Sequence, residues 1–339
     1  MHCKTLTILS VLVAFNVHAQ SQQVADVFQP IVSTCWDGDR IAPAHCGSTG
    51  DCGGCSTCEP RCPEFELSGG YLYMTREHNR NSQLVTATNT GDTLLGMSDL
   101  EGTFESGFEI RGRLSRFEFR YLEISSEDSF RIPASGVSQI RFLSDDYFST
   151  MDLDYDTDLQ SAEFNLLFSD PCEAVRLSGG FRYLQLDEDL DARFPGFTGA
   201  IFTQTRNELY GLQLGVDADL WTSRDRCFSL ICTSKAGVYY SGTDLDIFPN
   251  AAGAVTLGST SDSSERGAFV GELGLLMRVQ ATRCLSFDAG YNLLYITGVA
   301  LVGDQPQSGN LQPLLPATSS IENGDVLYHG LMTRATLSF

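Results

Sequence analysis

Long stretches in which apolar and polar side chains alternate constrain this chain more than any other feature of its sequence. From Tyr210 to Leu220 every even-numbered position is apolar, and the odd-numbered positions hold Gly, Gln or Asp. Residues two apart lie on the same side of a β-strand, so this strand would have one apolar and one polar face. Comparable stripes occur in 106–114, 267–280 and 284–297. Stripes of this length favour a transmembrane β-barrel over a soluble sandwich, whose strands are usually shorter.

The alternation predicts ten strands, and the lengths of their connections support one arrangement. Short turns near Ser115, Pro171, Arg224 and Arg283 follow the second, fourth, sixth and eighth strands, whereas the other connections are long. In an outer-membrane barrel the short turns face the periplasm and the long loops face outward. The predicted fold is therefore all-β, an antiparallel up-and-down transmembrane barrel of ten strands, with twelve as the alternative. The predicted strands are 64–74, 106–114, 117–125, 159–168, 174–186, 207–221, 227–240, 267–280, 284–297 and 325–339.

The beginning of the chain differs in composition from the rest and indicates export. Lys4 precedes an apolar stretch from Leu6 to Phe15, and Val17-His18-Ala19 has the small residues of a signal-peptide cleavage site. We therefore expect cleavage near Ala19 and a location in the bacterial outer membrane. The expected regions are a signal peptide (1–19), a Cys-rich periplasmic segment (20–63) and the outer-membrane barrel (64–339).

Charge and hydropathy exclude two other classes of protein. The formal net charge of −21 argues against a nucleic-acid-binding protein, because phosphate contacts need clustered Lys and Arg. Beyond the N-terminal stretch no run of 18 apolar residues occurs, so no transmembrane helix is expected. A barrel strand needs only about ten alternating residues, so a membrane β-barrel is still possible. The expected partner of the protein is the lipid of the outer membrane.

The N-terminal segment is dense in cysteine. Its last four cysteines and Pro63 match the spacing C-x2-C-x2-C-x3-C-P of bacterial ferredoxins, but no second such run exists. Iron–sulfur and zinc sites remain alternatives, and we expect no cofactor. We expect disulfides instead, within the segment or with other chains, because the periplasm is oxidising. Contact of the segment with the cell wall is the alternative. The disulfide candidates are Cys35, Cys46, Cys52, Cys55, Cys58, Cys62, Cys172, Cys227 and Cys284, and Cys232 is expected to be a packed thiol.

The final predicted strand ends in an aromatic residue. Phe339, Leu337, Ala335, Thr333 and Leu331 share one face of this strand. A terminal aromatic preceded by alternating apolar residues is similar to the C-terminal signal that the barrel assembly machinery recognises in bacterial outer-membrane proteins. We therefore expect Phe339 and Leu337 to act as the assembly signal.

Three stretches carry a resemblance to a known family. They are Gly179-Gly180-Phe181-Arg182-Tyr183-Leu184-Gln185-Leu186-Asp187-Glu188, the Cys-rich run before the first strand, and Gly70-Tyr71-Leu72-Tyr73. From about residue 60 onward the chain resembles a β-barrel porin family of bacterial outer-membrane proteins whose substrate is not established. The resemblance implies a barrel fold and an outer-membrane location, and it implies no catalytic residues.

The polar faces of the predicted strands would line the lumen with equal numbers of acids and bases. Ten strands enclose a narrow lumen, because about eight strands leave room only for side chains and open porins use 16 to 18. Buried charges must pair, so we expect salt bridges that leave at best a narrow conduit. The residues are Glu66, Glu109, Arg111, Arg113, Glu118, Arg120, Glu163, Arg176, Arg182, Asp217, Asp219, Lys235, Glu272, Arg278, Asp288 and Arg334.

Two acidic runs flank the short turn near Pro171, one before the fourth predicted strand and one after the fifth. Folding about this turn would place the runs side by side above the membrane, where carboxylates repel unless they are solvated or bridged by cations. Calcium at this rim is one hypothesis, and a solvated acidic rim is the alternative. The residues are Asp152, Asp154, Asp156, Asp158, Asp187, Glu188, Asp189 and Asp191.

Catalytic chemistry has little support in the sequence. After removal of the signal peptide the histidines are His45, His78 and His329, and none has an evident nucleophile partner. His329 is expected to point outward near an interface. We therefore expect a barrel with a structural or surface-interaction role. A narrow porin-type channel for small solutes is the second hypothesis, and an outer-membrane hydrolase is the third.

Overall fold

The structure is a computed structural model that describes the barrel and the elements folded into it. The described residues are 63–78, 83–87, 93–96, 99, 104–133, 140–142, 145–147, 150–195, 199–224, 227–251, 260–282, 284–305 and 321–339. The expected signal peptide, most of the Cys-rich segment and its six cysteines lie outside these residues. No helix in the described part of the chain is long and apolar enough to cross a membrane.

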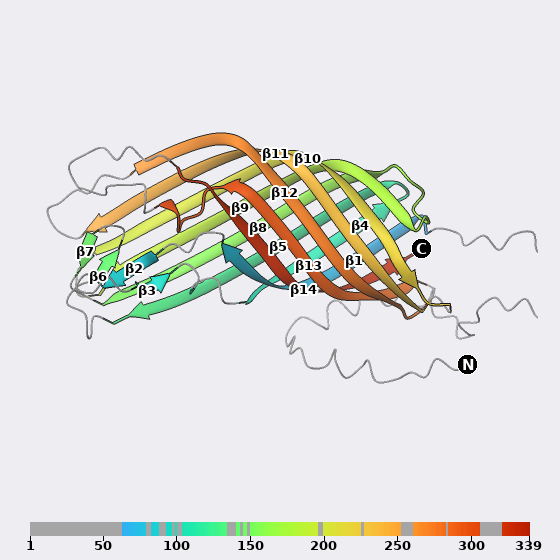
Figure 1. Cartoon of the computed structure of the whole chain (residues 1–339), viewed down its shortest axis with the longest axis horizontal. Helices are drawn as coiled ribbons and strands as arrows, with labels where there is room; N and C mark the ends of the chain where they lie inside the picture. Colours follow the sequence, from blue (N-terminus) through green and yellow to red (C-terminus); the bar gives the residue numbers. More distant parts are fainter. Residues whose placement is uncertain are drawn as a thin grey trace, which may run out of the picture. The chain divides into compact units, whose positions relative to one another are not determined.

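Ten antiparallel strands close into one barrel, which confirms the predicted fold and strand number (Figure 1). Neighbours in the barrel follow chain order, and the first strand pairs with the last. At this seam the backbones of Phe65 and Phe339 exchange two hydrogen bonds, and their rings stack. The strands are β1 (Phe65–His78), β4 (Phe104–Leu114), β5 (Phe117–Ile132), β8 (Met151–Leu167), β9 (Val175–Phe194), β10 (Gly199–Thr222), β11 (Phe228–Ala251), β12 (Thr260–Gln280), β13 (Leu285–Val299) and β14 (Gly324–Ser338).

The barrel has two different ends, which we call the turn end and the loop end. At the turn end, short connections join β4 to β5, β8 to β9, β10 to β11 and β12 to β13, as predicted. The first of these turns places Ser115 at a positive φ of 54°. At the loop end, four short strands form a separate sheet in the order β3-β2-β6-β7 (Figure 1). These are β2 (Gln83–Ala87), β3 (Thr93–Gly96), β6 (Ile140–Phe142) and β7 (Asp145–Tyr147), in stretches predicted to be loops.

Six strands (β5, β8, β9, β10, β11 and β12) extend at least seven residues further toward the loop end than predicted, so several of the predicted long loops were wrong. β8 begins at Met151 instead of residue 159, and β9 runs to Phe194 instead of residue 186. Only residues 195–198 separate β9 from β10. The cause is an inversion of the sequence pattern along each strand. In the extensions the outward residues are polar and the inward residues are apolar, as in Asp154 and Leu153 of β8.

The interior of the barrel is packed in layers. Near the turn end the inward side chains are charged. Toward the loop end follows an apolar cluster that includes Leu72, Leu122, Leu184 and Leu294, all nearly inaccessible to solvent. A second apolar cluster lies in the extensions and includes Leu153 and Leu190 of the barrel wall. Val85 of β2, Leu95 of β3, and Ala300 and Val302 after β13 also belong to it. The lumen is thus filled by side chains and by segments that fold inward.

Candidate functional site in the barrel lumen

The sixteen charged residues expected in the lumen all lie on the inward face of the strands near the turn end. Each of them makes at least one ion pair with another member of the set. We call this set the lumen network. Its ion pairs join Arg111 to Glu118 and Asp217, Arg113 to Glu66, Arg120 to Glu109, Glu163 and Glu272, Arg176 to Asp219, Arg182 to Glu163 and Glu272, Lys235 to Glu118 and Glu163, Arg278 to Asp288, and Arg334 to Glu109 and Asp288.

Arg120 is the centre of the network. Its guanidinium lies 2.6 Å from a carboxylate oxygen of Glu109, 3.0 Å from one of Glu163 and 2.7 Å from one of Glu272. β5 supplies the arginine, and β4, β8 and β12 supply the carboxylates. An arginine can bind three carboxylates at once because its planar guanidinium group carries five hydrogen-bond donors in a fixed arrangement. One side chain therefore links strands from opposite sides of the barrel.

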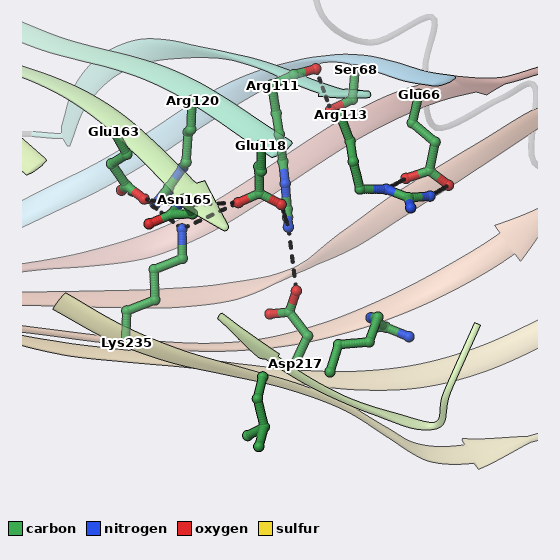
Figure 2. Close-up of polar contacts among 12 residues, drawn as sticks. Glu66, Ser68, Arg111, Arg113, Glu118, Arg120, Glu163, Asn165, Asp217 and Lys235 are labelled. Atoms are coloured by element: carbon green, nitrogen blue, oxygen red, sulfur yellow. Dashed lines mark hydrogen bonds and ion pairs between the residues drawn. The ribbon is translucent and has the colours of Figure 1, made fainter. Parts of the chain in front are cut away.

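Other bases extend the network from this centre. Lys235 donates to Glu163 at 2.6 Å, and Arg182 approaches Glu272 at 3.2 Å. Figure 2 shows Lys235, Glu163 and Asn165 close together, with Glu118 and Arg111 beside them. Arg111 in turn contacts Asp217 at 3.2 Å (Figure 2). Positive and negative groups alternate along this path, so no described member of the set is left without an opposite charge.

Burial divides the network into a closed centre and a more accessible margin. The side chains of Arg120, Glu109, Glu163 and Arg182 retain between 1% and 4% of their solvent exposure. Toward the turn end the exposed fraction rises to 31% for Arg278. Charges at the centre have lost their water almost completely, so each depends on its partners for stability. The charged side chains at the centre are thus buried, whereas those at the margin are partly exposed.

Uncharged polar residues, which were not predicted, complete the network. Asn165 and Gln213 both donate to Glu163, and Asn292 donates to Glu272 at 3.2 Å. Ser161 accepts a hydrogen bond from Arg182 at 2.8 Å. They occupy inward positions of predicted strands, so the face assignment could have found them. They carry no charge, so the predicted set of acids and bases did not include them.

A second ion pair lies deeper in the barrel and was also missed. Arg76 of β1 pairs with Glu188 of β9 and contacts the hydroxyl group of Tyr155. Its guanidinium lies 5.9 Å from the ring centres of both Tyr155 and Tyr328. Glu188 was expected at the acidic rim with its neighbours. It instead faces inward and is buried, because its position in β9 has the opposite parity to Asp187 and Asp189.

The remaining seven residues of the expected rim do lie side by side on the outer surface. Asp154 pairs with Asp191 across the β8–β9 ladder, Asp156 with Asp189 and Asp158 with Asp187. The outward apolar band of β8 ends near Ala162, so these carboxylates lie beyond the membrane-facing part. Among the described residues no group of three acidic, His or Cys side chains could hold a metal ion. Calcium at this rim therefore stays a prediction, as does the solvated rim.

Burial, and after it the charge of neighbouring carboxylates, raises the pKa of three aspartates on this outer surface. Burial, and then the charges of Glu127, Asp189 and Asp191, raise the pKa of Asp156 above its ordinary value. Burial is also the main cause that raises the pKa of Asp158 and of Asp189. Arg193 and Arg206 offset part of the repulsion through ion pairs with Asp154, Asp191 and Asp187.

The other expected residues lie away from the network. Cys172, at the turn between β8 and β9, is disulfide-bonded, and the thiol of Cys284 is not. Cys232 lies on the outward face of β11 rather than in the packed interior. His329 points outward, as expected, and its Nε2 lies 3.1 Å from Glu77. His78 is the last residue of β1 instead of part of a loop, and His45 lies outside the described residues.

Solved structures with a similar arrangement of strands are membrane β-barrels. The outer membrane protease OmpT from Escherichia coli is 7% identical, with a TM-score of 0.45, over 81% of this chain and 96% of that one. The translocator domain of the autotransporter NalP from Neisseria meningitidis is 10% identical, with a TM-score of 0.35, over 83% and 90%. The toluene transporter TodX from P. putida is 9% identical, with a TM-score of 0.30, over 81% and 90%.

Comparison of sequences identifies a family. No curated protein sequence matches the chain. A family model described as "Putative beta barrel porin-7 (BBP7)" matches residues 129–323, which is more than half of the chain. The match includes Gly179–Glu188, one of the three stretches that carried the resemblance, and the other two lie outside it. Together with the closed barrel, whose outward face carries the apolar residues, it defines an outer-membrane β-barrel. The chain belongs to the putative beta barrel porin-7 family.

Proposed function

We propose that this protein is a closed outer-membrane barrel with a structural or surface-interaction role, and that it is not an open solute pore. The observation that carries the proposal is the central cluster of the lumen network. Arg120 holds three carboxylates from three other strands, and none of these four side chains exposes more than 7% of its surface. An open pore would keep such charges hydrated.

The energetics support a closed state at this level. A buried ion that loses its partner costs several kcal/mol, so moving one member of the cluster leaves the others unpaired. The two apolar clusters close the lumen again toward the loop end. A solute would have to displace both kinds of layer. The outer surface of the extensions, with its paired acidic rows, is then the part of the protein that a partner outside the membrane would meet.

A narrow channel for small solutes is the second candidate, and one observation favours it. Charged side chains at the turn end are partly exposed, with 30% for Glu66, 31% for Asp219 and 31% for Arg278. Water and small ions therefore reach the margin of the network. Transport would require that the pairs at the centre exchange partners.

Planar-bilayer recording of the full-length protein separates the two candidates. The closed barrel gives no stable open-channel current at moderate voltage. A variant with Glu163→Gln serves as the comparison, because it removes a charge that Arg120, Arg182 and Lys235 share. Large, stable currents from the unmodified protein would overturn the proposal. Small discrete currents that change their ion selectivity in the variant would support the narrow channel.

Export and the absence of catalysis belong to the same proposal. The basic and apolar N-terminus supports a cleaved signal peptide, and the disulfide at Cys172 supports an oxidising compartment. Membership of a porin family supports a non-catalytic barrel. Among the described residues His329 contacts Tyr291 and Glu77 on the outer surface, and neither of them is a serine or cysteine nucleophile. N-terminal sequencing of the mature protein tests the cleavage.

A further inference from the structure

A short segment after β13 folds into the lumen and is held there by polar side chains of the barrel wall. Residues Ala300, Leu301 and Val302 are fully buried, and Asp304 and Gln305 retain 1% and 2% of their exposure. We call Ala300–Gln305 the inner segment. It is not part of the barrel ladder, since β13 ends at Val299 and β14 begins at Gly324. It can therefore leave the lumen without breaking the hydrogen bonds between strands.

Asn207 of β10 recognises the backbone of the inner segment. Its side-chain oxygen accepts the N–H of Ala300 at 2.7 Å, and its side-chain nitrogen donates to the carbonyl of the same residue at 2.8 Å. Asn207 is held by Thr243, which donates to it at 3.0 Å, and it also donates to the carbonyl of Leu186 at 3.2 Å. The wall thus presents one acceptor and one donor side by side in a fixed orientation.

Glu188 provides a second contact for the inner segment. One of its oxygens accepts the N–H of Val302 at 2.7 Å, and the other pairs with Arg76. Because Arg76 pairs with Glu188, the carboxylate that binds Val302 already has an opposite charge and would gain little from a cationic ligand. Leaving a charge unpaired in this apolar surrounding would be costly.

The wall offers more polar groups than the inner segment uses. Thr205 pairs with Glu188 in the β9–β10 ladder, and Thr157 pairs with Glu188 on its other side. Ser241 lies opposite Leu209, two residues from Asn207. These three side chains are at least 96% buried, and their hydroxyl oxygens have no hydrogen-bond partner among the described residues. Buried hydroxyl groups are normally satisfied, so these three are free to bind a ligand that enters the site.

We propose that the lumen wall around Asn207 and Glu188 is a binding site for a small uncharged polar solute, and that the inner segment occupies this site in the closed barrel. A solute with an adjacent donor and acceptor makes the two bonds that Ala300 makes with Asn207. Its further hydroxyl groups contact Thr205, Ser241 and Thr157. This goes beyond a structural role, because it makes the closed barrel a receptor whose own chain competes with the ligand.

N-acetylglucosamine is a suitable probe, since it is uncharged and carries one amide and several hydroxyl groups. Binding is measured by equilibrium dialysis on the full-length protein folded in detergent micelles. The test variant replaces 300–305 by alternating Gly and Ser of equal length. We expect this variant to bind the probe at least about tenfold more tightly than the unmodified protein. Glucosamine, which carries a positive charge, should bind more weakly than the acetylated sugar.

Two substitutions in the test variant show where the probe binds. Asn207→Ala should weaken binding about tenfold or more, because it removes both the donor and the acceptor. Gln160→Ala is the matched control, since this amide lies on the outer face of β8, where it donates to Asp158, and its loss should leave binding unchanged. Binding that is absent in the folded test variant, or that Asn207→Ala does not weaken, overturns the proposal.

A second measurement needs no replacement of the segment. Hydrogen–deuterium exchange of the unmodified protein follows the amide hydrogens of Ala300 and Val302. Saturating N-acetylglucosamine should speed their exchange several-fold while the β13–β14 ladder stays protected. If the probe leaves their exchange unchanged and the replaced variant does not fold, the hydroxyl groups hold water only and the proposal fails. Neither result depends on conductance, so the proposed closed barrel is tested separately.

Discussion

The turn-end half of the barrel and its loop-end extension use the same strands with opposite polarity. In β8, Phe164 points outward and Glu163 inward near the turn end, whereas Asp154 points outward and Leu153 inward in the extension. β9 repeats this inversion with Phe181 and Arg182, then with Asp189 and Leu190. The solvent outside the wall explains the difference. Apolar outward residues are favourable where the wall faces lipid, and charged outward residues are favourable where it faces water.

What fills the lumen also differs between the two halves. In the turn-end half the inward residues cannot all be apolar without making a strand that is apolar on both faces, so charge is placed inside and paired. In the extension the outward face already carries the charge, and the interior is packed as in a soluble protein. One half is therefore stabilised by ion pairs and the other by apolar burial. The following four substitutions or conditions test this contrast, from the largest expected effect to the smallest.

Removal of Arg120 should have the largest effect. Arg120→Leu leaves Glu109, Glu163 and Glu272 close together without their shared base. We expect the free energy of unfolding to fall by about 3–5 kcal/mol, measured by urea unfolding in lipid vesicles. The neighbouring outward substitution Phe119→Leu is the control and should cost much less, because Leu also suits lipid. Equal losses from both substitutions would contradict a structural role for the network.

In the extension the sensitive residue should be the apolar one. Leu190→Ala creates a cavity in the second apolar cluster, which lies in the extensions. It should lower the free energy of unfolding by about 2–5 kcal/mol in the same experiment. Asp189→Ala changes the adjacent outward residue and should have an effect within about 0.5 kcal/mol. The reverse order, with Asp189 more important, would show that the extension does not have an apolar interior.

Charge on the outer surface should be tolerated only beyond the lipid. Leu212 of β10 is 68% exposed and lies within the outward apolar band. Leu212→Arg should lower stability by about 2–4 kcal/mol if it lies near the bilayer midplane. Gln204 lies on the same face of β10 beside Asp189, and Gln204→Arg should therefore have little effect on stability or increase it slightly. Equal effects at the two positions would place the boundary of the lipid elsewhere.

The acidic rows should respond weakly to pH. A carboxyl group whose pKa is raised by folding stabilises the protein in its protonated form, and this stability is lost as the pH rises through the raised pKa. Asp156→Asn should therefore raise the melting temperature at pH 7, and the gain should vanish toward pH 3.8, the ordinary pKa of aspartate. Because Asp156 is largely exposed, the effect should stay below about 1 kcal/mol. A gain that grows at low pH would have the wrong sign.

The alternation predicted the barrel strands near the turn end because each residue of these strands faces either the lipid or the lumen. Strands such as β13, predicted as 284–297, differ from the structure by only one or two residues at each end. The same rule failed in the extensions, because an acidic row such as Asp152 to Asp158 resembles a loop when lipid is assumed to lie outside. The alternation is present there too, with Leu153 and Tyr155 between the acids, but its phase is reversed.

The candidate site, like the fold, could be predicted only in part from the sequence. The inward position of Arg120 and of its partners follows from parity along each strand, so the membership of the lumen network could be predicted. The pairs themselves could not, because Arg120 and Glu272 are 152 residues apart and meet only across the closed cylinder. Glu188 shows the limit most clearly, since the shift of one position from Asp187 moves it from water into the core.

By itself the sequence determined the barrel class, the number of its strands and the faces that carry charge, because a two-residue period depends only on local backbone geometry. The tertiary structure decided how far each strand continues beyond the lipid, which charges pair and where the inner segment lies. These depend on closure of the barrel, which brings β1 against β14 and places distant side chains in one narrow lumen. Contacts across that lumen join strands that have no relation along the chain, and no local pattern encodes them.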